Sequence, residues 1–274
     1  MNIRPYLSAF SVQWRVGLRY RIAIFAGFAA QLWFGAITLM AYAAVYRHAP
    51  HVRAPMSLAQ AMSYTWLQQA LFRLLPIGCL PQVGDAARTG AIAFDLLRPL
   101  NLWNWWYSAS FSWLAGSTFP RAALMILAAG PLAALCGLSD WGLAAPASAS
   151  ALAMALLSFL LGAALSATMV MWLNILTART LSPRGSYAIA TPLAVLLSGM
   201  LLPLPLYPDW VRLALLAQPF AGVSDIPIRI YLGVPIPGGI GTGLALQAGW
   251  IVALTVLGRF WLGRVVERLE VQGG

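Results

Sequence analysis

The chain has no lysine, only seven acidic residues and only two cysteines among its 274 residues. Charged residues make up 9% of the sequence, whereas 61% of the residues are hydrophobic and the mean hydropathy is +0.77. A single soluble core cannot enclose so much apolar surface, so the composition excludes an ordinary soluble protein and indicates an integral membrane protein. The apolar runs are continuous rather than alternating, which favours an all-α membrane protein over a β-barrel.

Catalytic and nucleotide-binding motifs are also missing from the sequence. It contains no GxxxxGK[ST] loop to hold ATP phosphates, no Ser/His/Asp set and no paired carboxylates inside the apolar runs. His48 and His51 are spaced like metal ligands, but no cysteine or carboxylate lies near them, so we expect no metal site. We therefore expect that this chain is not an enzyme and holds no cofactor of its own.

The apolar runs predict six transmembrane helices in a single domain over residues 1–274. Because about twenty apolar residues cross a bilayer, we expect spans at approximately 22–45, 57–78, 119–138, 150–177, 186–204 and 243–263. The first run is too long for a cleaved signal peptide, so we expect it to stay as a span. Cys79 and Cys136 fall at opposite ends of neighbouring spans, which argues against a disulfide between them.

The net charge of +10 would suit nucleic acid, but the seventeen arginines are spread along the chain rather than gathered in a stripe, so we expect no nucleic-acid binding. The positive-inside rule explains the same charge. With both termini in the cytoplasm, thirteen arginines lie on the inner side, and only four lie outside: Arg47, Arg53, Arg212 and Arg229. This asymmetry predicts cytoplasmic termini.

The stretch 102–117, LWNWWYSASFSWLAGS, predicts a separate helix lying flat at the inner membrane surface. Joined to the third span it would form about 55 Å of helix, which exceeds the thickness of a bilayer. We therefore expect the third span to begin at Pro120 and Arg121, with Asn101, Asn104 and Ser110 facing water. Five aromatic residues would lie at headgroup level: Trp103, Trp105, Trp106, Tyr107 and Trp113.

The outer connection 205–242 is long and still apolar. Within it, DWVRLALLAQPF predicts a short helix with Asp209 as its N-cap and an end before Pro219. A second apolar piece, IPIRIYLGVPIP, is interrupted by prolines. Together the two pieces predict a re-entrant helical hairpin on the outer side.

The cytoplasmic connection between the second and third spans reads VGDAARTGAIAFDLLRPL. It predicts a short helix over 85–97, capped by Asp85, in which Asp95 and Arg98 pair at i, i+3. From the pattern alone, this segment fits an ordinary solvated helix as well as a docking site.

Four polar residues interrupt the apolar second span: Tyr64, Thr65, Gln68 and Gln69. The first three share one face of a helix, and two interpretations of that face stay open. It could line a translocation path, or it could form hydrogen bonds between helices without touching a substrate. Asn174 and Gln247 are isolated polar residues in later spans, which favours the second role for them.

Five stretches resemble the permease subunits of ABC exporters of the type-2 class: SYTWLQQALF at 63–72, TGAIAFDLLRPL at 89–100, LLSGMLLPLPLYPDWVRLALLAQPF at 196–220, IRIYLGV at 228–234 and RLEVQGG at 268–274. The resemblance extends over nearly the whole chain. It implies a six-span permease of a group usually encoded beside a similar permease and an ATPase, in the inner membrane of a bacterium.

The resemblance also implies roles for particular residues. The segment with Asp85, Arg88, Asp95, Arg98 and Pro99 would be the coupling helix that docks on an ABC ATP-binding subunit, and that partner would bind ATP and Mg²⁺. A second permease subunit, identical or paralogous with a heteromer favoured, and membrane lipid would be the other partners. The substrate stays open, and so does the alternative of a membrane scaffold or assembly protein that docks a cytoplasmic partner without transport.

Overall fold

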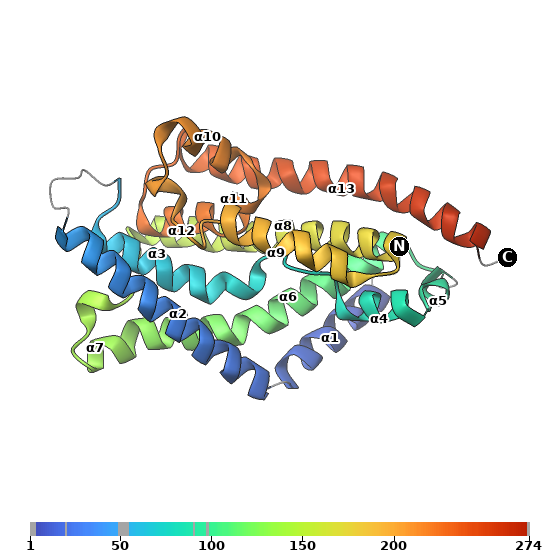
Figure 1. Ribbon diagram of the computed structural model, residues 1–274, viewed down its shortest axis with the longest axis horizontal. Helices are drawn as coiled ribbons and strands as arrows, with labels where there is room; N and C mark the ends of the chain where they lie inside the picture. Colours follow the sequence, from blue (N-terminus) through green and yellow to red (C-terminus); the bar gives the residue numbers. More distant parts are fainter. Residues whose placement is uncertain (1–3, 20, 49–54, 90, 97–98, 273–274) are drawn as a thin grey trace.

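The structure, a computed structural model, describes residues 4–19, 21–48, 55–89, 91–96 and 99–272 (Figure 1). The fold is all-helical, with 83% of the chain in helices and no strand among the described residues. This confirms the all-α prediction. Within the described residues, four helices are long and apolar enough to cross a membrane.

Three of the four long helices coincide with predicted spans. They are α2 (Arg21–His48), α8 (Ala149–Thr180) and α13 (Gly239–Gln272). Local capping explains the ends of α8, because the Ser148 hydroxyl accepts a hydrogen bond from the amide of Ala151 at 3.0 Å, and Leu181 ends the helix in a left-handed conformation. These helices are candidate spans and cover the stretches predicted at 22–45, 150–177 and 243–263.

The fourth long helix corrects the prediction for residues 102–138. Helix α6 (Leu102–Leu127) is continuous through Pro120 and passes through a π-helical turn, η2 (Ala128–Leu132), into α7 (Ala133–Leu135). No separate interfacial helix precedes the third span, so that prediction was wrong. Trp103 and Trp106 are buried, because they pack against α8 and α13 rather than lying free at headgroup level.

The second and fifth predicted spans are shorter as helices than the about twenty residues that cross a bilayer. Helix α3 (Leu58–Leu71) begins in a capping box of Ser57 and Gln60 and continues as a 3-10 turn, η1 (Phe72–Leu74). Helix α9 (Pro183–Leu197) ends before Gly199. Six spans therefore stay a prediction, whereas four long apolar helices are present.

The predicted cytoplasmic helix over 85–97 consists of two helices. Helix α4 (Pro81–Thr89) begins four residues earlier than expected, and α5 (Ile92–Leu96) follows it. Asp85 therefore lies within α4 and does not cap it. Proline is well tolerated at the first position of a helix, which explains the earlier start at Pro81.

The long connection 205–242 contains three short helices after the 3-10 turn η4 (Leu204–Leu206): α10 (Asp209–Ala217), α11 (Pro219–Val223) and α12 (Asp225–Leu232). Pro208 rather than Asp209 is the N-cap of α10, so the predicted cap was wrong by one residue, whereas the helix does end before Pro219. Asp209 instead pairs with Arg212 at 2.8 Å. The re-entrant character of this hairpin stays a prediction.

Helix α8 is central to the arrangement, since α4, α6, α9, α11, α12 and α13 all pack against it. Helix α13 forms one long side of the molecule, and α2 and α6 lie toward the other side (Figure 1). The remaining helix, α1 (Arg4–Arg19), packs along α6. Helices α4 and α5 lie at the same end of the molecule as the C-terminal part of α13, and α10 and α12 lie at the opposite end (Figure 1).

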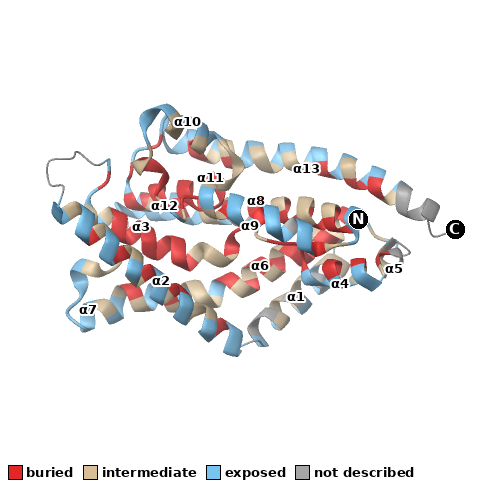
Figure 2. Cartoon of the chain, in the orientation of Figure 1, coloured by how far each residue is buried: buried red, intermediate tan, exposed pale blue. Residues whose placement is uncertain are grey.

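The core is formed mainly by the short helices and α8. Every residue from Ala61 to Ala70 of α3 is buried, and so is every residue from Ala221 to Ile230. In contrast, α2 and α13 expose apolar side chains over much of their length (Figure 2). Exposed apolar faces on the long helices are what a bilayer requires.

Candidate functional site

The polar residues of α3 have different roles. The Tyr64 hydroxyl donates to Asp225 Oδ1 of α12 at 2.6 Å, and the Gln68 amide donates to the Ser198 carbonyl at 2.8 Å. Gly199, next in the chain, has a left-handed φ of 83°, and a Cβ atom there would collide with the Tyr64 hydroxyl. Tyr64 and Gln68 therefore join α3 to α12 and to the end of α9.

Asp225 is a site residue that the sequence analysis did not select. It lies outside the predicted spans, as expected, yet its side chain is 0% exposed. Its Oδ2 atom lies 3.6 Å from Nη1 of Arg229, which is itself 3% exposed. Burial raises the pKa of Asp225 from 3.8 to about 6, although Arg229 and the Tyr64 hydrogen bond oppose that change. The sequence signal that could have identified this site is the i, i+4 spacing of Asp225 and Arg229 within an apolar stretch.

Thr65 and Gln69 do not join this cluster. The Thr65 hydroxyl donates to the carbonyl of Ala61 in its own helix at 3.0 Å. Gln69 lines a groove of about 380 Å³ between α2, α3, α6 and the segment after α9. Gln31 of α2 also lines the groove, and its Oε1 atom is buried without a hydrogen-bond partner. Of the four polar residues predicted on the second span, only Gln69 lines this groove.

The groove has mostly apolar walls with a few polar groups. Phe34, Phe72, Val195, Met200 and Leu201 provide much of its apolar lining. Phe34 is 62% exposed and Leu201 is 65% exposed. Hereafter this surface, with Gln31 and Gln69, is called the α2–α3 groove.

Asn174 and Gln247 connect helices, as their isolation in the sequence indicated. Asn174 Oδ1 accepts from the amide of Leu80 at 2.8 Å, and its Nδ2 donates to the Ser110 hydroxyl at 3.1 Å. Ser110 is therefore buried in the bundle and does not face water, contrary to the prediction. Gln247 Nε2 of α13 donates to the Ser158 carbonyl at 2.9 Å, and its Oε1 accepts from the Ser158 hydroxyl at 2.8 Å.

The predicted docking residues lie on and after α4 and α5. Asp85 and Arg88 are exposed and lie 3.9 Å apart, which is a weak surface pair. Asp95 Oδ2 accepts a hydrogen bond from Trp106 Nε1 at 3.1 Å. Arg98 lies outside the described residues, so its predicted pairing with Asp95 stays a prediction, and Pro99 is exposed.

Helix α4 is attached to the bundle by its other face. Val83, Gly84 and Ala87 are buried, and α4 packs against α8. The hydrogen bond from Leu80 to Asn174 holds the residue before α4 against the same helix. A force applied to the exposed face of α4 would therefore be transmitted to α8, against which α6, α9, α11, α12 and α13 also pack.

Residues 32–273 match the family model described as ABC-2 family transporter protein. The chain belongs to the ABC-2 transporter family. The match includes all four candidate spans except the first turns of α2, and it confirms a multi-pass membrane permease. No match was found among the curated proteins or the solved structures.

Among the described residues, no group of three or more metal-ligating side chains is found, and both cysteines are free. Within that part of the chain, the buried amides described above connect helices or line the α2–α3 groove.

Proposed function

We propose that this ABC-2 permease is the transmembrane subunit of an ATP-driven exporter in a bacterial inner membrane. In this proposal, separate ATP-binding subunits dock on α4 and α5 at the cytoplasmic face and hydrolyse ATP with Mg²⁺. Two permease chains form the translocation path between them. The second chain is identical or paralogous, and the sequence resemblance favours a paralogue.

The observation that carries the proposal is the two-sided character of α4. One face is buried on α8 through Val83, Gly84 and Ala87, and the other presents Asp85 and Arg88 to solvent. A short helix with a free polar face and a firm attachment to the bundle suits rigid-body coupling between an ATPase and membrane helices. Its position at the same end as the C-terminal part of α13 agrees with cytoplasmic termini (Figure 1).

The α2–α3 groove is the surface that we propose for the second permease chain and the translocation path. Lipid satisfies an apolar helix face, but the polar atoms of Gln31 and Gln69 prefer protein or water as neighbours. Gln31 and Gln69 are 6% and 4% exposed at the base of this groove, and the guanidinium-bearing Arg121 also lines it. A groove with these polar groups beside exposed apolar side chains is better covered by another chain than by lipid. Closing of the ATPase dimer would move α4 and α8 and so change the packing between the two permease chains at this groove.

Capture of partner subunits from the native membrane tests the proposal. The wild-type chain, solubilised gently, is expected to bring down an ABC ATP-binding subunit, and an Asp85→Ala, Arg88→Ala double variant is expected to lose most of it. An Asp95→Ala, Arg98→Ala variant tests the adjoining part of the segment. The control is Asp209→Ala, Arg212→Ala, which removes a partly exposed i, i+3 acid–base pair on α10 at the opposite end of the molecule.

Transport separates the exporter from a membrane scaffold, which would also capture a partner. The purified complex is expected to hydrolyse ATP faster in the presence of a transported compound, and that compound should accumulate in inverted membrane vesicles supplied with ATP. A captured ATPase whose rate no tested compound changes, together with no ATP-dependent accumulation, would favour the scaffold.

A further inference from the structure

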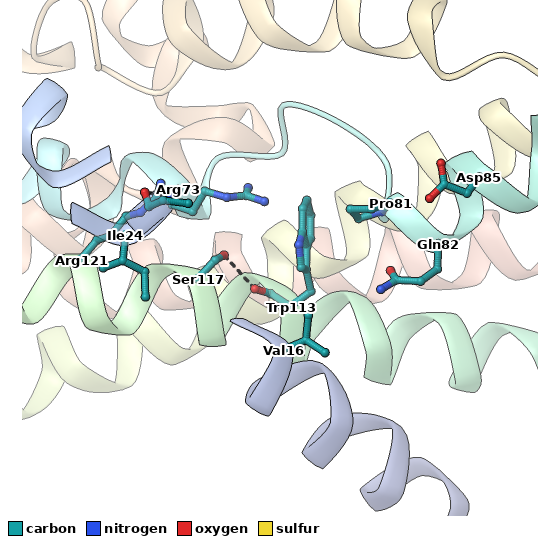
Figure 3. Close-up of a pocket in the computed structure, with 10 residues that line it drawn as sticks. Val16, Ile24, Arg73, Pro81, Gln82, Asp85, Trp113, Ser117 and Arg121 are labelled. Atoms are coloured by element: carbon teal, nitrogen blue, oxygen red, sulfur yellow. Dashed lines mark hydrogen bonds between the residues drawn. The ribbon is translucent and has the colours of Figure 1, made fainter. Parts of the chain in front are cut away.

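A second cavity, of about 420 Å³, lies between α1, α2, η1, α4 and α6. Ala23 and Ile24 line it, and these are the third and fourth residues of α2. The cavity therefore lies at the level where the first span enters the membrane. Its lining includes two arginines, Arg73 and Arg121, together with Trp113 (Figure 3).

Arg73 points into this cavity without a polar partner. Its guanidinium carbon lies 4.0 Å from the ring centroid of Trp113, and the two side chains point toward one another (Figure 3). The contact fixes one face of the guanidinium against an aromatic ring. Among the described residues, no carboxylate pairs with Arg73 and no acceptor receives its N–H groups, so its edge stays available to a ligand.

Arg121 is the second cationic group, and it is only partly satisfied. Its Nη2 donates to the carbonyl of Ala23 at 2.8 Å, but its Nε is buried without a hydrogen-bond partner. A buried donor without an acceptor is unfavourable, and an anionic oxygen is the partner that a guanidinium binds best.

The cavity carries excess positive charge. Asp85 is the acid among its lining residues, but its side chain is 77% exposed and lies beside Arg88 at 3.9 Å. It therefore does not neutralise two guanidiniums inside. A cavity with two like charges and one unpaired buried donor is completed by an anion.

We infer that this cavity, hereafter the Arg73–Arg121 cavity, binds an anionic phosphate group, either of a phospholipid headgroup or of a soluble phosphate compound. Phosphate suits the planar donor fork of arginine, and an aromatic residue beside it is typical of headgroup level. The bilayer surface presents anionic phosphate at the depth of Ile24. The site shares Arg121 with the α2–α3 groove, whereas Arg73 and Trp113 line only the Arg73–Arg121 cavity.

Native mass spectrometry of the purified full chain tests the site. The protein is exchanged into detergent with either phosphatidylglycerol or phosphatidylcholine, and the retained lipid is counted. We expect Arg73→Gln and Arg121→Gln each to retain phosphatidylglycerol about tenfold less than wild type, whereas zwitterionic phosphatidylcholine retention should stay the same. Arg264→Gln is the control, because Arg264 is an exposed arginine that does not line the cavity.

A substitution that fills the cavity tests the site while both arginines are kept. Val16 lines the cavity from α1, so Val16→Trp should block it and reduce phosphatidylglycerol retention by a similar factor. Equal retention of phosphatidylglycerol by wild type and all three cavity variants, with no effect of phosphate on any of them, would overturn the inference.

A thermal-shift arm with inorganic phosphate, compared with chloride at equal ionic strength, distinguishes the sources. Stabilisation of wild type by phosphate, absent in Arg73→Gln, identifies a site that accepts a soluble phosphate compound. Selective phosphatidylglycerol retention without that stabilisation identifies the lipid headgroup.

Discussion

At the residue scale, single buried amides hold this membrane bundle together. Asn174 is 0% exposed and receives a backbone N–H from Leu80 while donating to Ser110. It therefore connects α8 to the start of α4 and to α6. Loss of such a residue leaves the amide and the hydroxyl without partners inside the protein.

We predict that Asn174→Leu lowers the unfolding free energy by about 1–3 kcal/mol, because the Leu80 amide and the Ser110 hydroxyl lose their partner. Thermal unfolding in nanodiscs measures the change. Asn104→Leu is the control, since the Asn104 side chain bonds Arg259 at the surface and its loss should cost no more than about 0.5 kcal/mol. Equal effects of the two variants would contradict a special role for Asn174.

A second prediction at this scale concerns pH. The Asp225 pKa is raised from 3.8 to about 6, so the folded state binds this proton more tightly than the unfolded state. The resulting stabilisation is fully present below about pH 4 and is lost as the pH rises through about 6. The groups that face Asp225 are Tyr64, Arg229 and the backbone of Leu204.

Asp225→Asn should remove this dependence. Between pH 4 and 7, wild-type stability is expected to fall relative to the variant by no more than about 3 kcal/mol. Unfolding temperatures measured across that range check the difference. Parallel curves for the two proteins would show that Asp225 does not titrate there.

At the element scale, the two faces of α4 have separable roles. Val83→Ala removes buried contacts with the bundle and should lower the unfolding free energy by about 1–2 kcal/mol. Asp85→Ala with Arg88→Ala should leave stability nearly unchanged, because an exposed pair contributes little, yet it should reduce capture of the ATPase. Unfolding and capture assays on the same preparations measure both effects. Loss of stability with intact capture in the double variant would contradict the proposed docking face.

At the scale of the whole molecule, the proposed second permease chain is predicted to lie on the α2–α3 groove. In a background with Cys79→Ser and Cys136→Ser, Phe34→Cys should form an oxidative or bifunctional cross-link between two permease chains in the membrane. Val252→Cys of α13 is the matched control, since Phe34 and Val252 are each 62% exposed but only Phe34 lines the groove.

Expression of this chain alone, and then together with a paralogous permease, distinguishes a homodimer from a heteromer in the same assay. A cross-link of Phe34→Cys only in the second case identifies a paralogous partner. Efficient cross-linking through Val252→Cys instead would place the interface on α13.

The pattern of apolar residues predicted the parts of the fold that depend on chain-local properties. Spans over α2, α8 and α13 follow from length and hydropathy, because any apolar segment of about twenty residues gains by crossing a bilayer as a helix. The prediction for the start of α6 was wrong. Tryptophans in an apolar stretch are typical of interfacial anchors, but Trp103 and Trp106 pack against α8 and α13, which lie far away in the sequence. Helix α4 begins four residues before the predicted Asp85 cap, because proline suits the first position of a helix and Pro81 occupies it.

The sequence by itself determined that this chain is an all-helical membrane protein without a GxxxxGK[ST] motif. It also singled out the few polar residues within the apolar runs as candidate site residues. Only the tertiary structure decided what those residues do. In the fold, Tyr64 donates a hydrogen bond to Asp225, and Asn174 accepts one from the Leu80 amide. Gln69 lines the α2–α3 groove, and Arg73 and Arg121 line the same cavity. The physical reason is that hydropathy acts on each segment separately, whereas hydrogen bonds and charge pairs depend on contacts between residues far apart in the chain.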